Sequence, residues 1–539
     1  MKKIFYSADA RDKVLSGAKQ LYDAVKVTFG PKGQNVVIEK TYGAPVITHD
    51  GVTVAEAVDL GSTDDNLGEQ VGARLIKGAA QKLNKVAGDG TTTVTVLTYN
   101  ILNEANKLIA AGVNPMELRK GIEQAGAEVV KNINKQAEKI EGDNTKVAEV
   151  ATISAGDATI GKLIAEVISK IGKDGVVTVE AGQGLEMEQE IVEGFSYDKG
   201  FSSPFFVTDI NRQEAIFNKP SILITDKKLS AAADILPILE KCAATGQKDL
   251  VIIAEEVEGE ALSLLVLNKL KGVFNSLVLK APSFGERRKE IMEDIAILTG
   301  ATVVSADKGL KLEEVDLDVL GSANKIIATK DETTIIKGAG SQANVKDRIK
   351  LIQAQSNLAH SDYEREEFDK RAAALLGKVA VIKVGGATET EIEEKKFRVD
   401  DAVAATKAAL AEGIVTGGGV TLINLASTLK TTDMGAKIVQ NALKTPFIHI
   451  VENAGLNAQA LLAEVEKAKP GQGINVIAPE KGLIDLKKAG VIDPARVTRE
   501  AVQNAISIAA TAITMGALIV EVPEKEDNSA ANNMGGGMY

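Results

Sequence analysis

The stretch Gly88-Asp89-Gly90-Thr91-Thr92-Thr93 combines residue types that bind phosphate and a cation. Its glycines allow a tight turn, and its threonines lead into an apolar-periodic segment that predicts a helix over 91–110. The first N–H groups of a helix lack intrahelical partners, so backbone and hydroxyls can bind an anion there. Asp89 is a hard oxygen ligand suited to Mg²⁺ that also contacts phosphate. Taken alone, the hexapeptide is explained equally well as a turn before a capped helix.

A second glycine-rich turn, Thr416-Gly417-Gly418-Gly419, also precedes a predicted helix. By itself such a turn is typical of a helix cap, but the two turns together indicate a two-sided nucleotide cradle. The candidate acids are Asp50 and Asp401. Asp401 lies on an amphipathic helix predicted over 398–412, where a solvent-exposed position is the default interpretation.

A third glycine-rich segment, Gly156–Lys162, has the spacing of a P-loop. Leu163 stands where a P-loop requires serine or threonine, and no buried apolar strand precedes the segment. We therefore interpret it as the capped start of a helix.

Length and composition restrict the class of protein. A chain of 539 residues is too long for one core and predicts three or four domains. The net charge of −11, without a basic tract, argues against nucleic-acid binding. One cysteine, Cys242, excludes an internal disulfide framework, and three scattered histidines make a histidine metal site or a catalytic triad a poor fit. No signal-peptide-like or membrane-spanning apolar run occurs, so we expect a cytoplasmic protein without membrane contact.

The pattern of elements predicts a multidomain α and α/β protein. Helices are expected over 8–28, 67–86, 91–135 with a new start at Asn114-Pro115, 345–376 and 398–412, and a hairpin over 35–39 and 45–48. Between about 140 and 380, short apolar runs, including 176–179, 222–224, 250–254, 277–279, 302–304, 326–328 and 333–336, alternate with helices, as in an α/β domain. Helical character returns after 413, which favours one helical domain interrupted by an insertion. Consecutive independent domains are the alternative.

Two predicted helices in the α/β region are unusually apolar. The segment Val257–Gly272 has leucine and valine on nearly all sides of the predicted helix. The preceding predicted helix is similarly apolar, with Ile235, Leu236, Ile238 and Leu239. Such helices are either buried on all sides or present an apolar face to a partner. Core packing is the more common explanation.

Several longer motifs, in order along the chain, resemble a group I chaperonin of the GroEL type. They are TFGPKG (28–33), HDGVTVA (49–55), GDGTTT (88–93), NPMELRKGI (114–122), EGEAL (258–262), TGGGV (416–420) and the ending NNMGGGMY. The resemblance implies an equatorial ATP-binding domain (1–135 and 412–539), largely helical. It further implies a small intermediate hinge domain (136–192 and 380–411) and an inserted α/β apical domain (193–379).

The same resemblance implies an ATP-dependent folding chaperone and an ATPase. Its cofactors would be ATP, Mg²⁺ and K⁺, and its partners non-native polypeptides and a GroES-type co-chaperonin. Copies of the chain would form rings, with two heptamers stacked, and no nucleic acid or membrane would take part.

Site residues follow from the resemblance motif by motif. Asp401 and Asp50 would be catalytic, and Asp89 would hold Mg²⁺, with the backbone of Thr28 and His49 available to K⁺. The nucleotide would contact Thr28, Phe29, Gly30, Pro31, His49, Gly51, Asp89, Gly90, Thr91, Thr92, Thr93, Gly418, Asn475, Val476, Ile477 and Asp493. The apolar groove for clients and co-chaperonin would comprise Phe201, Ser203, Phe205, Phe206, Leu236, Leu239, Leu262, Val266 and Leu267.

The chain departs from the family pattern at several points. His49 stands where the family usually has lysine, and about four extra residues lie between Asp50 and Asp89, around 61–64. Gly377-Lys378 replaces a hinge Gly-Gly, which leaves Gly194, Gly377 and Gly413 as hinge candidates. These departures keep a second hypothesis open, a ring scaffold that binds ATP, hydrolyses it weakly and holds unfolded proteins. A third hypothesis, an unrelated ATP-dependent metabolic enzyme, lacks support because the sequence contains no group of residues that would recognise a specific substrate.

Overall fold

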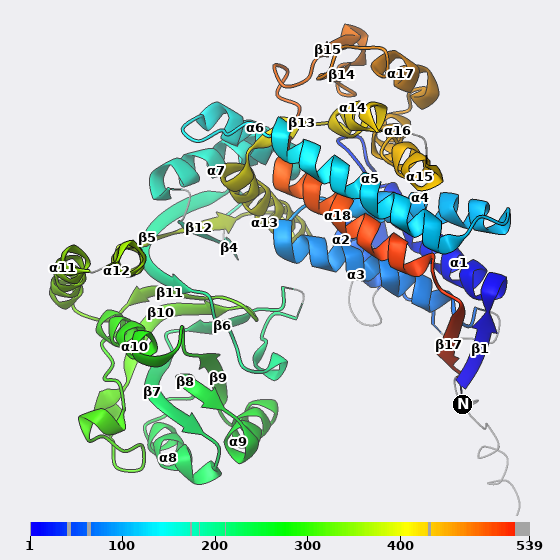
Figure 1. Ribbon diagram of the computed structural model, residues 1–539. Coiled ribbons are helices and arrows are strands. Elements are labelled where there is room, and N and C mark those ends of the chain that lie inside the picture. Colours follow the sequence, from blue (N-terminus) through cyan, green and yellow to red (C-terminus); the bar gives the residue numbers. More distant parts are fainter. Residues whose placement is uncertain are drawn as a thin grey trace, which may run out of the picture. The chain divides into compact units, whose positions relative to one another are not determined.

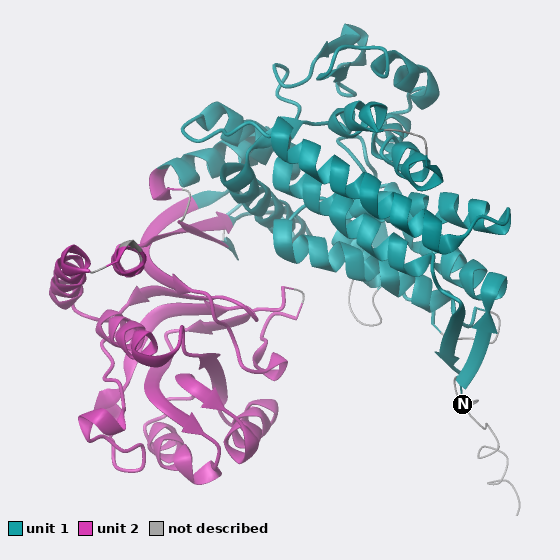
Figure 2. Ribbon diagram, viewed as in Figure 1, with its two compact units in different colours: residues 1–169, 179–188, 384–539 teal, residues 170–178, 189–383 magenta. Residues whose placement is uncertain are grey.

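The computed structural model describes residues 2–39, 45–61, 66–172, 175–182, 184–210, 212–359, 361–429 and 433–522. The chain forms two compact units (Figure 2). Unit 1 comprises residues 1–169, 179–188 and 384–539, and unit 2 comprises 170–178 and 189–383. Unit 1 is mainly helical and unit 2 is α/β, so the architecture is the multidomain α and α/β fold that the sequence predicts.

Helices build most of unit 1 (Figure 1). They are α1 (Ser7–Lys26), α2 (Gly51–Ala57), α3 (Glu69–Ala87), α4 (Thr91–Ala110), α5 (Pro115–Gln136), α6 (Asn144–Ala155), α7 (Ala158–Ile171), α13 (Glu389–Glu412), α14 (Val420–Thr428), α15 (Met434–Ala442), α16 (Thr445–Asn453), α17 (Ala458–Val465) and α18 (Ala495–Ala512). Four two-stranded antiparallel sheets accompany them: β1 (Lys2–Tyr6) with β17 (Ala517–Glu521), β2 (Val36–Ile38) with β3 (Val46–Thr48), β13 (Ile414–Thr416) with β16 (Ile492–Pro494), and β14 (Gln472–Ile474) with β15 (Leu483–Asp485).

The two ends of the chain share one core in unit 1. Helix α18 packs against α3, α4 and α5, and its Val502 and Ala505 are buried in the same cluster as Leu97 and Ile101 of α4. Helices α1 and α3 approach closely because Gly72 carries no side chain: a Cβ there would lie 1.8 Å from the carbonyl oxygen of Val14. The returning helical pattern after residue 413 therefore reflects a single interrupted core.

Most expected elements of unit 1 are confirmed. Helices α1, α3, α4 and α5 and the β2–β3 hairpin agree with the predicted spans to within a few residues, and Asn114 caps α5 by accepting from Met116 N at 2.8 Å. Helix α13 begins at Glu389, earlier than predicted, because the Thr388 hydroxyl accepts from Glu391 N there. The hairpin turn, part of the insertion near 62–64, His360 and the C-terminal tail lie outside the described residues.

Unit 2 is organised on a nine-stranded sheet. Its order is β4-β12-β5-β11-β10-β7-β8-β9, with β6 also paired to β10. The strands are β4 (Val176–Ala181), β5 (Glu188–Tyr197), β6 (Ala215–Asn218), β7 (Ser221–Leu229), β8 (Asp249–Val257), β9 (Asn275–Lys280), β10 (Gly321–Ala328), β11 (Thr333–Gly338) and β12 (Lys378–Val384). Helices α8 (Leu236–Ala244) and α9 (Gly259–Leu270) connect the parallel strands β7, β8 and β9, as crossover connections in α/β proteins do.

Two predictions for unit 2 are wrong. The helix expected over 345–376 is two helices, α11 (Gln342–Leu358) and α12 (Asp362–Leu375), because the Ser361 hydroxyl accepts from Glu364 N and starts a new helix. The run 302–304 forms no strand and contributes only a bridge between Val304 and Thr225 of β7. Its Val303 and Val304, which follow α10 (Gly285–Thr299) in the chain, are buried in the core of unit 2, and this burial accounts for their apolar character.

None of the described helices has both the length and the apolarity needed to cross a bilayer.

Candidate functional site

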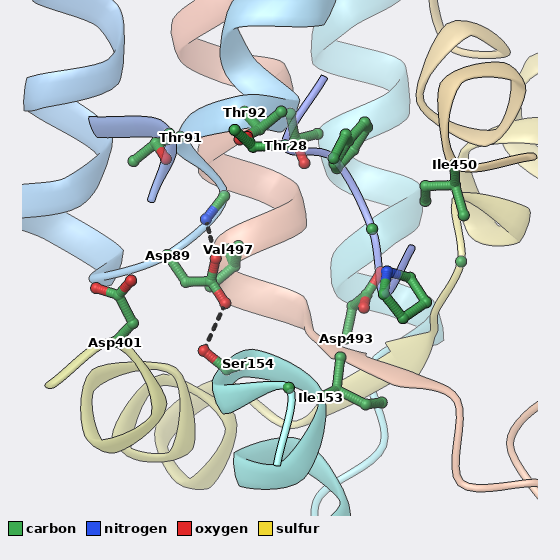
Figure 3. A pocket seen from close by; sticks show the side chains of 18 of the residues that line it. Thr28, Asp89, Thr91, Thr92, Ile153, Ser154, Asp401, Ile450, Asp493 and Val497 are labelled. Atoms are coloured by element: carbon green, nitrogen blue, oxygen red, sulfur yellow. Dashed lines mark hydrogen bonds between the residues drawn. The ribbon is translucent and has the colours of Figure 1, made fainter. Parts of the chain in front are cut away.

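Unit 1 contains a cavity of about 570 Å³ (Figure 3). Its wall comes mainly from the loop after α1, the segment after β3, the turn before α4, the end of α6, helix α13, the turn before α14, helix α16, and residues 474–477 and 491–498. Every residue that the sequence assigned to the nucleotide or to catalysis lines it: Thr28, Phe29, Gly30, Pro31, His49, Asp50, Gly51, Asp89, Gly90, Thr91, Thr92, Thr93, Asp401, Gly418, Asn475, Val476, Ile477 and Asp493. Folding thus brings together residues that are up to 465 positions apart in the sequence.

Two helices begin at this cavity with a glycine as N-cap. Gly90 (φ 85°) precedes α4 and Gly419 (φ 76°) precedes α14, and no side chain of the described residues caps either helix. The first N–H groups of α4 carry no side-chain cap and can bind an anion, whereas at α14 the Val420 N–H already donates to the Gly417 carbonyl at 3.2 Å. The positive end of each helix dipole favours a negative ligand. This geometry supports a phosphate-binding function for both glycine-rich turns.

Asp89 lies at the mouth of α4 with its carboxylate held in place. Ser154 Oγ donates to one carboxylate oxygen at 2.9 Å, and Gly90 N donates to the other (Figure 3). No three His, Cys, Asp or Glu residues in the described part of the chain are grouped to hold a metal. Mg²⁺ commonly takes one or two carboxylates and completes its shell with water and phosphate oxygens. A single oriented carboxylate beside a phosphate-binding helix start therefore fits Mg²⁺ that arrives with a nucleotide.

Asp401 reaches the cavity from α13. Gly88, just before Asp89, allows α13 to approach because a Cβ there would lie 2.0 Å from the Cβ of Ala404. Burial raises the pKa of Asp401 well above its ordinary value, and the charges of Asp50 and Asp89 raise it further. A carboxylate with a raised pKa is a stronger base than a surface aspartate, which suits proton abstraction from water.

Asp50 has a structural function besides facing the cavity. Its carboxylate accepts from Val52 N at 3.0 Å, Thr53 N at 2.8 Å and the Thr53 hydroxyl at 2.6 Å, and so caps α2. Its side chain is thereby fixed, so Asp50 contributes a stationary negative charge to the cavity.

Acidic side chains outnumber basic ones in the cavity wall. Five carboxyl groups line it, from Asp50, Asp89, Glu394, Asp401 and Asp493, and the lining contains no lysine. The raised pKa values of Asp401 and Asp493 keep part of this acidic set protonated near neutral pH. Arg398 is the one arginine of the lining, and it is paired with Glu394 through its Nε at 2.5 Å.

His49 adds little positive charge at neutral pH, because burial and the charge of Arg398 lower its pKa. A polyphosphate could enter such a cavity only together with cations.

Asp493 is carried by β16 beside the second glycine-rich turn. The β13–β16 pair places Asp493 opposite Val415, and a Cβ at Gly417 would lie 2.9 Å from the Asp493 carboxylate. Burial, and then the charge of Asp89, raise the pKa of Asp493 to about 7.

This raised pKa of Asp493 predicts how stability depends on pH. A carboxyl with a higher pKa in the folded than in the unfolded state contributes stability that is full below about pH 4 and is lost as pH rises through about 7. Asp493→Asn removes this ionisation. In nucleotide-free protein we expect the melting temperature of the variant, relative to wild type, to rise by about 2–4 °C between about pH 5.5 and about pH 8.5. A difference that stays constant over this range would contradict the assignment.

Sequence reasoning missed several side chains of the site, among them Ser154 and Arg398. Arg398 lies three residues before Asp401 on α13, so helical periodicity alone could have placed it on the same face. Ser154 has no comparable signal because its contact with Asp89 joins segments 65 residues apart. The neighbouring segment Gly156–Lys162 is the capped helix start that we expected, since Asp157 accepts from Thr159 N and Ile160 N at the start of α7.

The residues predicted to form the apolar groove differ in their exposure to solvent in unit 2. Phe205 of the 3₁₀ turn η1 (Pro204–Phe206), Leu236 of α8 and Leu267 of α9 are exposed, and Leu262 and Val266 of α9 are half-buried. Phe201, Ser203, Phe206 and Leu239 are buried, so in this structure they support the surface from beneath. Helices α8 and α9 both pack against the short turn η2 (Ala232–Asp234), and α9 also contacts η1, so the exposed members belong to one region (Figure 1).

Lys269 joins η1 to α9. Its Nζ donates to the Phe206 carbonyl at 2.6 Å and lies 5.7 Å and 5.1 Å from the ring centres of Phe206 and Phe217. Burial lowers its pKa to about 8. The exposed Phe205 is therefore presented on a turn that is fastened to α9.

The architecture of the whole chain is that of a chaperonin. The chaperonin gp146 from bacteriophage EL 2 (Pseudomonas aeruginosa), crystallised in the presence of ATP-BeFx, superimposes with a TM-score of 0.67 and 21% sequence identity. The match covers 97% of this chain and 99% of the phage chain, and it establishes a common fold. A family model of the TCP-1/cpn60 chaperonins matches residues 21–523, so the chain belongs to the TCP-1/cpn60 chaperonin family.

Proposed function

We propose that this chaperonin is the subunit of an ATP-hydrolysing group I folding machine. Copies of the chain form two stacked heptameric rings, capture non-native polypeptides on an apolar apical surface and enclose them under a GroES-type co-chaperonin. ATP binding and hydrolysis in unit 1 drive the cycle. The division into an equatorial domain (1–135 and 412–539), an intermediate domain (136–192 and 380–411) and an apical domain (193–379) belongs to this proposal, with Gly194, Gly377 and Gly413 as its hinges.

The observation that supports this function most strongly is the composition of the cavity in unit 1. Two glycine-capped helix starts, an oriented aspartate and an aspartate of raised pKa all line one space of about 570 Å³. Phosphoryl transfer needs mainly positioning and charge neutralisation, and this arrangement offers both. A cavity of this volume is also suitable for a nucleotide-sized ligand.

In the proposed reaction each group has one task. The N–H groups and hydroxyls at the start of α4 hold the phosphates, and Asp493 and the segment Asn475–Ile477 contact ribose and base. Asp401 accepts a proton from the attacking water as the water oxygen bonds to the γ-phosphorus and the bond from that phosphorus to the bridging oxygen breaks. Asp50, fixed as the cap of α2, helps to orient the water.

Cations complete the site because the wall carries five carboxylates and one arginine. Asp89 would hold Mg²⁺, and the backbone carbonyls of Thr28 and His49 would hold K⁺. When bound, these ions supply the positive charge that neutralises the phosphates. Ser154, which donates to the Asp89 carboxylate at 2.9 Å, would keep this carboxylate fixed for such an ion.

A second function is favoured by one specific observation. His49 stands at the position where the family usually has lysine, and its pKa is lowered. The positive charge of Arg398 is paired with Glu394. With so little fixed positive charge, the ring could bind ATP and hydrolyse it slowly, holding unfolded proteins without refolding them.

Refolding of a chemically denatured, aggregation-prone enzyme distinguishes the two functions. For the folding machine we expect recovery of enzyme activity that requires ATP and increases with a GroES-type co-chaperonin. Suppression of aggregation with or without ATP, but no recovery of activity, would support the holding scaffold. Electron micrographs of the purified protein should show end-on rings, and a purely monomeric protein would contradict both functions.

A further inference from the structure

The loop after α1 enters the cavity, and its Phe29 packs against the main core of unit 1. Thr28, Phe29, Gly30 and Pro31 line the cavity. The final carbonyl groups of a helix lack intrahelical partners. Here Phe29 N donates to Lys26 O at 3.2 Å and Gln34 N donates to Val27 O at 2.8 Å, so the loop itself supplies a first donor to each of these two carbonyls. Donor groups for the Phe29 carbonyl, and second donors for the helix end, come from elsewhere. The Thr28 hydroxyl itself donates to Val25 O at 2.9 Å, within the same turn.

Asn453, the last residue of α16, supplies these groups. Its Nδ2 donates to the carbonyls of Lys26 and Phe29, at 2.9 Å each, and lies 3.5 Å from the carbonyl of Val27. A primary amide carries two N–H donors on one atom, so one side chain holds both the helix end and the loop beyond it. The contact joins segments 424–427 residues apart.

The same helix also lies behind the loop. A Cβ at Gly30 (φ 81°) would lie 3.1 Å from the side chain of Ile450, so Gly30 and Ile450 are in close contact. Ile450 and Pro446 of α16 both line the cavity. Helix α16 is therefore the support against which the loop is held.

A neighbouring hydrogen bond joins α1 and α16 without involving the loop. His449 Nε2 and the Tyr22 hydroxyl are 2.7 Å apart, and Tyr22 lies one turn before the end of α1. Neither residue lines the cavity. The pair α1–α16 thus offers one hydrogen bond that holds the helices together and another that holds the loop.

We propose that Asn453 is a positioning residue for nucleotide binding, which fixes the loop Thr28–Pro31 in the conformation that receives ATP. This inference rests on the proposed function, since the loop is assigned to nucleotide there. Asn453 is not among the residues that line the cavity, so it acts on binding through the loop rather than on the chemical step.

The test is a comparison of Asn453→Ala with wild type in the full assembled protein. Loss of both hydrogen bonds should weaken ADP binding, measured by isothermal titration calorimetry, about tenfold, and should raise the KM for ATP about tenfold. The kcat at saturating ATP should stay within about twofold, since a lost binding interaction that is equal in ground and transition states leaves kcat unchanged. Asn453→Gln, which keeps the NH₂ donors, should recover part of the affinity.

Tyr22→Phe is the matched control, because it removes one hydrogen bond between the same helices and leaves the loop contacts intact. We expect its ADP affinity to equal that of wild type. An equal loss of affinity in both variants would overturn the inference, as would wild-type affinity in Asn453→Ala. If Asn453→Ala does not assemble, Asn453→Asp, which removes both donors at constant size, must show the same rise in KM. A wild-type protein that binds no ADP would instead refute the proposed function.

Discussion

Replacing Asp401 by asparagine is expected to lower ATP turnover by about 10²–10⁴-fold while the KM for ATP changes by only a few-fold. The substitution keeps the size of the side chain and removes the proton acceptor. Burial raises the pKa of Asp401 well above its ordinary value, and its position on α13 is secured by the close contact between Gly88 and Ala404. The rate of product formation under single-turnover conditions measures the chemical step directly.

Asp400→Asn provides the matched control for this experiment. It makes the same substitution one position earlier on α13, and Asp400 does not line the cavity. Its turnover should remain close to that of wild type. Equal turnover in wild type and Asp401→Asn would show that another group accepts the proton. A comparable loss in both variants would point to a general disturbance of α13.

The pH dependence of turnover adds an independent criterion. A general base works only when it is deprotonated, so the wild-type rate should fall as pH decreases through the raised pKa of Asp401. Asp401→Asn should lose this acidic limb and retain its low rate across the range.

Leu236→Glu and Leu267→Glu are expected to reduce capture of unfolded polypeptide at least about tenfold and to leave ATP turnover unchanged. Both side chains are exposed, 42% and 52%, on the adjacent helices α8 and α9. Placing an unpaired carboxylate against an apolar chain costs several kcal/mol, whereas the apolar contact it replaces is non-directional and accepts many sequences. The cavity is formed entirely by residues of unit 1, so the change in unit 2 spares it.

Co-sedimentation of a denatured client with the purified chaperonin measures capture. Leu351→Glu is the matched control: Leu351 is 49% exposed in the same unit but lies on α11, outside the predicted groove. Capture should remain at the wild-type level in this variant. If the three variants lose capture equally, overall negative charge is responsible, and if none loses it, the exposed apolar residues of α8 and α9 do not bind clients.

Local patterns in the sequence were sufficient for most of unit 1. The helices α1, α3, α4 and α5 have a clear apolar period, and Asn114-Pro115 marks the start of α5 by capping chemistry that depends on neighbouring residues alone. The break between α11 and α12 was missed because the charged pattern continues across it, and a single serine cap decides it. The run 302–304 was misread because a buried segment that pairs with the sheet at a single bridge has the same apolar character as a strand.

Long motifs also located the candidate site. All the nucleotide and catalytic candidates do line one cavity, although the lowered pKa of His49 and the pairing of Arg398 with Glu394 could not be inferred from residue types. In unit 2, residue types indicated an apolar surface, but which side chains are exposed, such as Leu267, and which are buried, such as Phe206, depends on the packing around them.

The sequence by itself determined most helices of unit 1, the glycine turns and the candidate phosphate-binding and acidic groups, because these depend on short-range backbone geometry and side-chain chemistry. Only the tertiary structure decided which side chains hold those groups in place. Ser154 on Asp89, Asn453 on the loop after α1, and Ala404 against Gly88 are contacts between segments 65 to 424 residues apart. Their formation depends on how helices pack in three dimensions, and no local pattern encodes it.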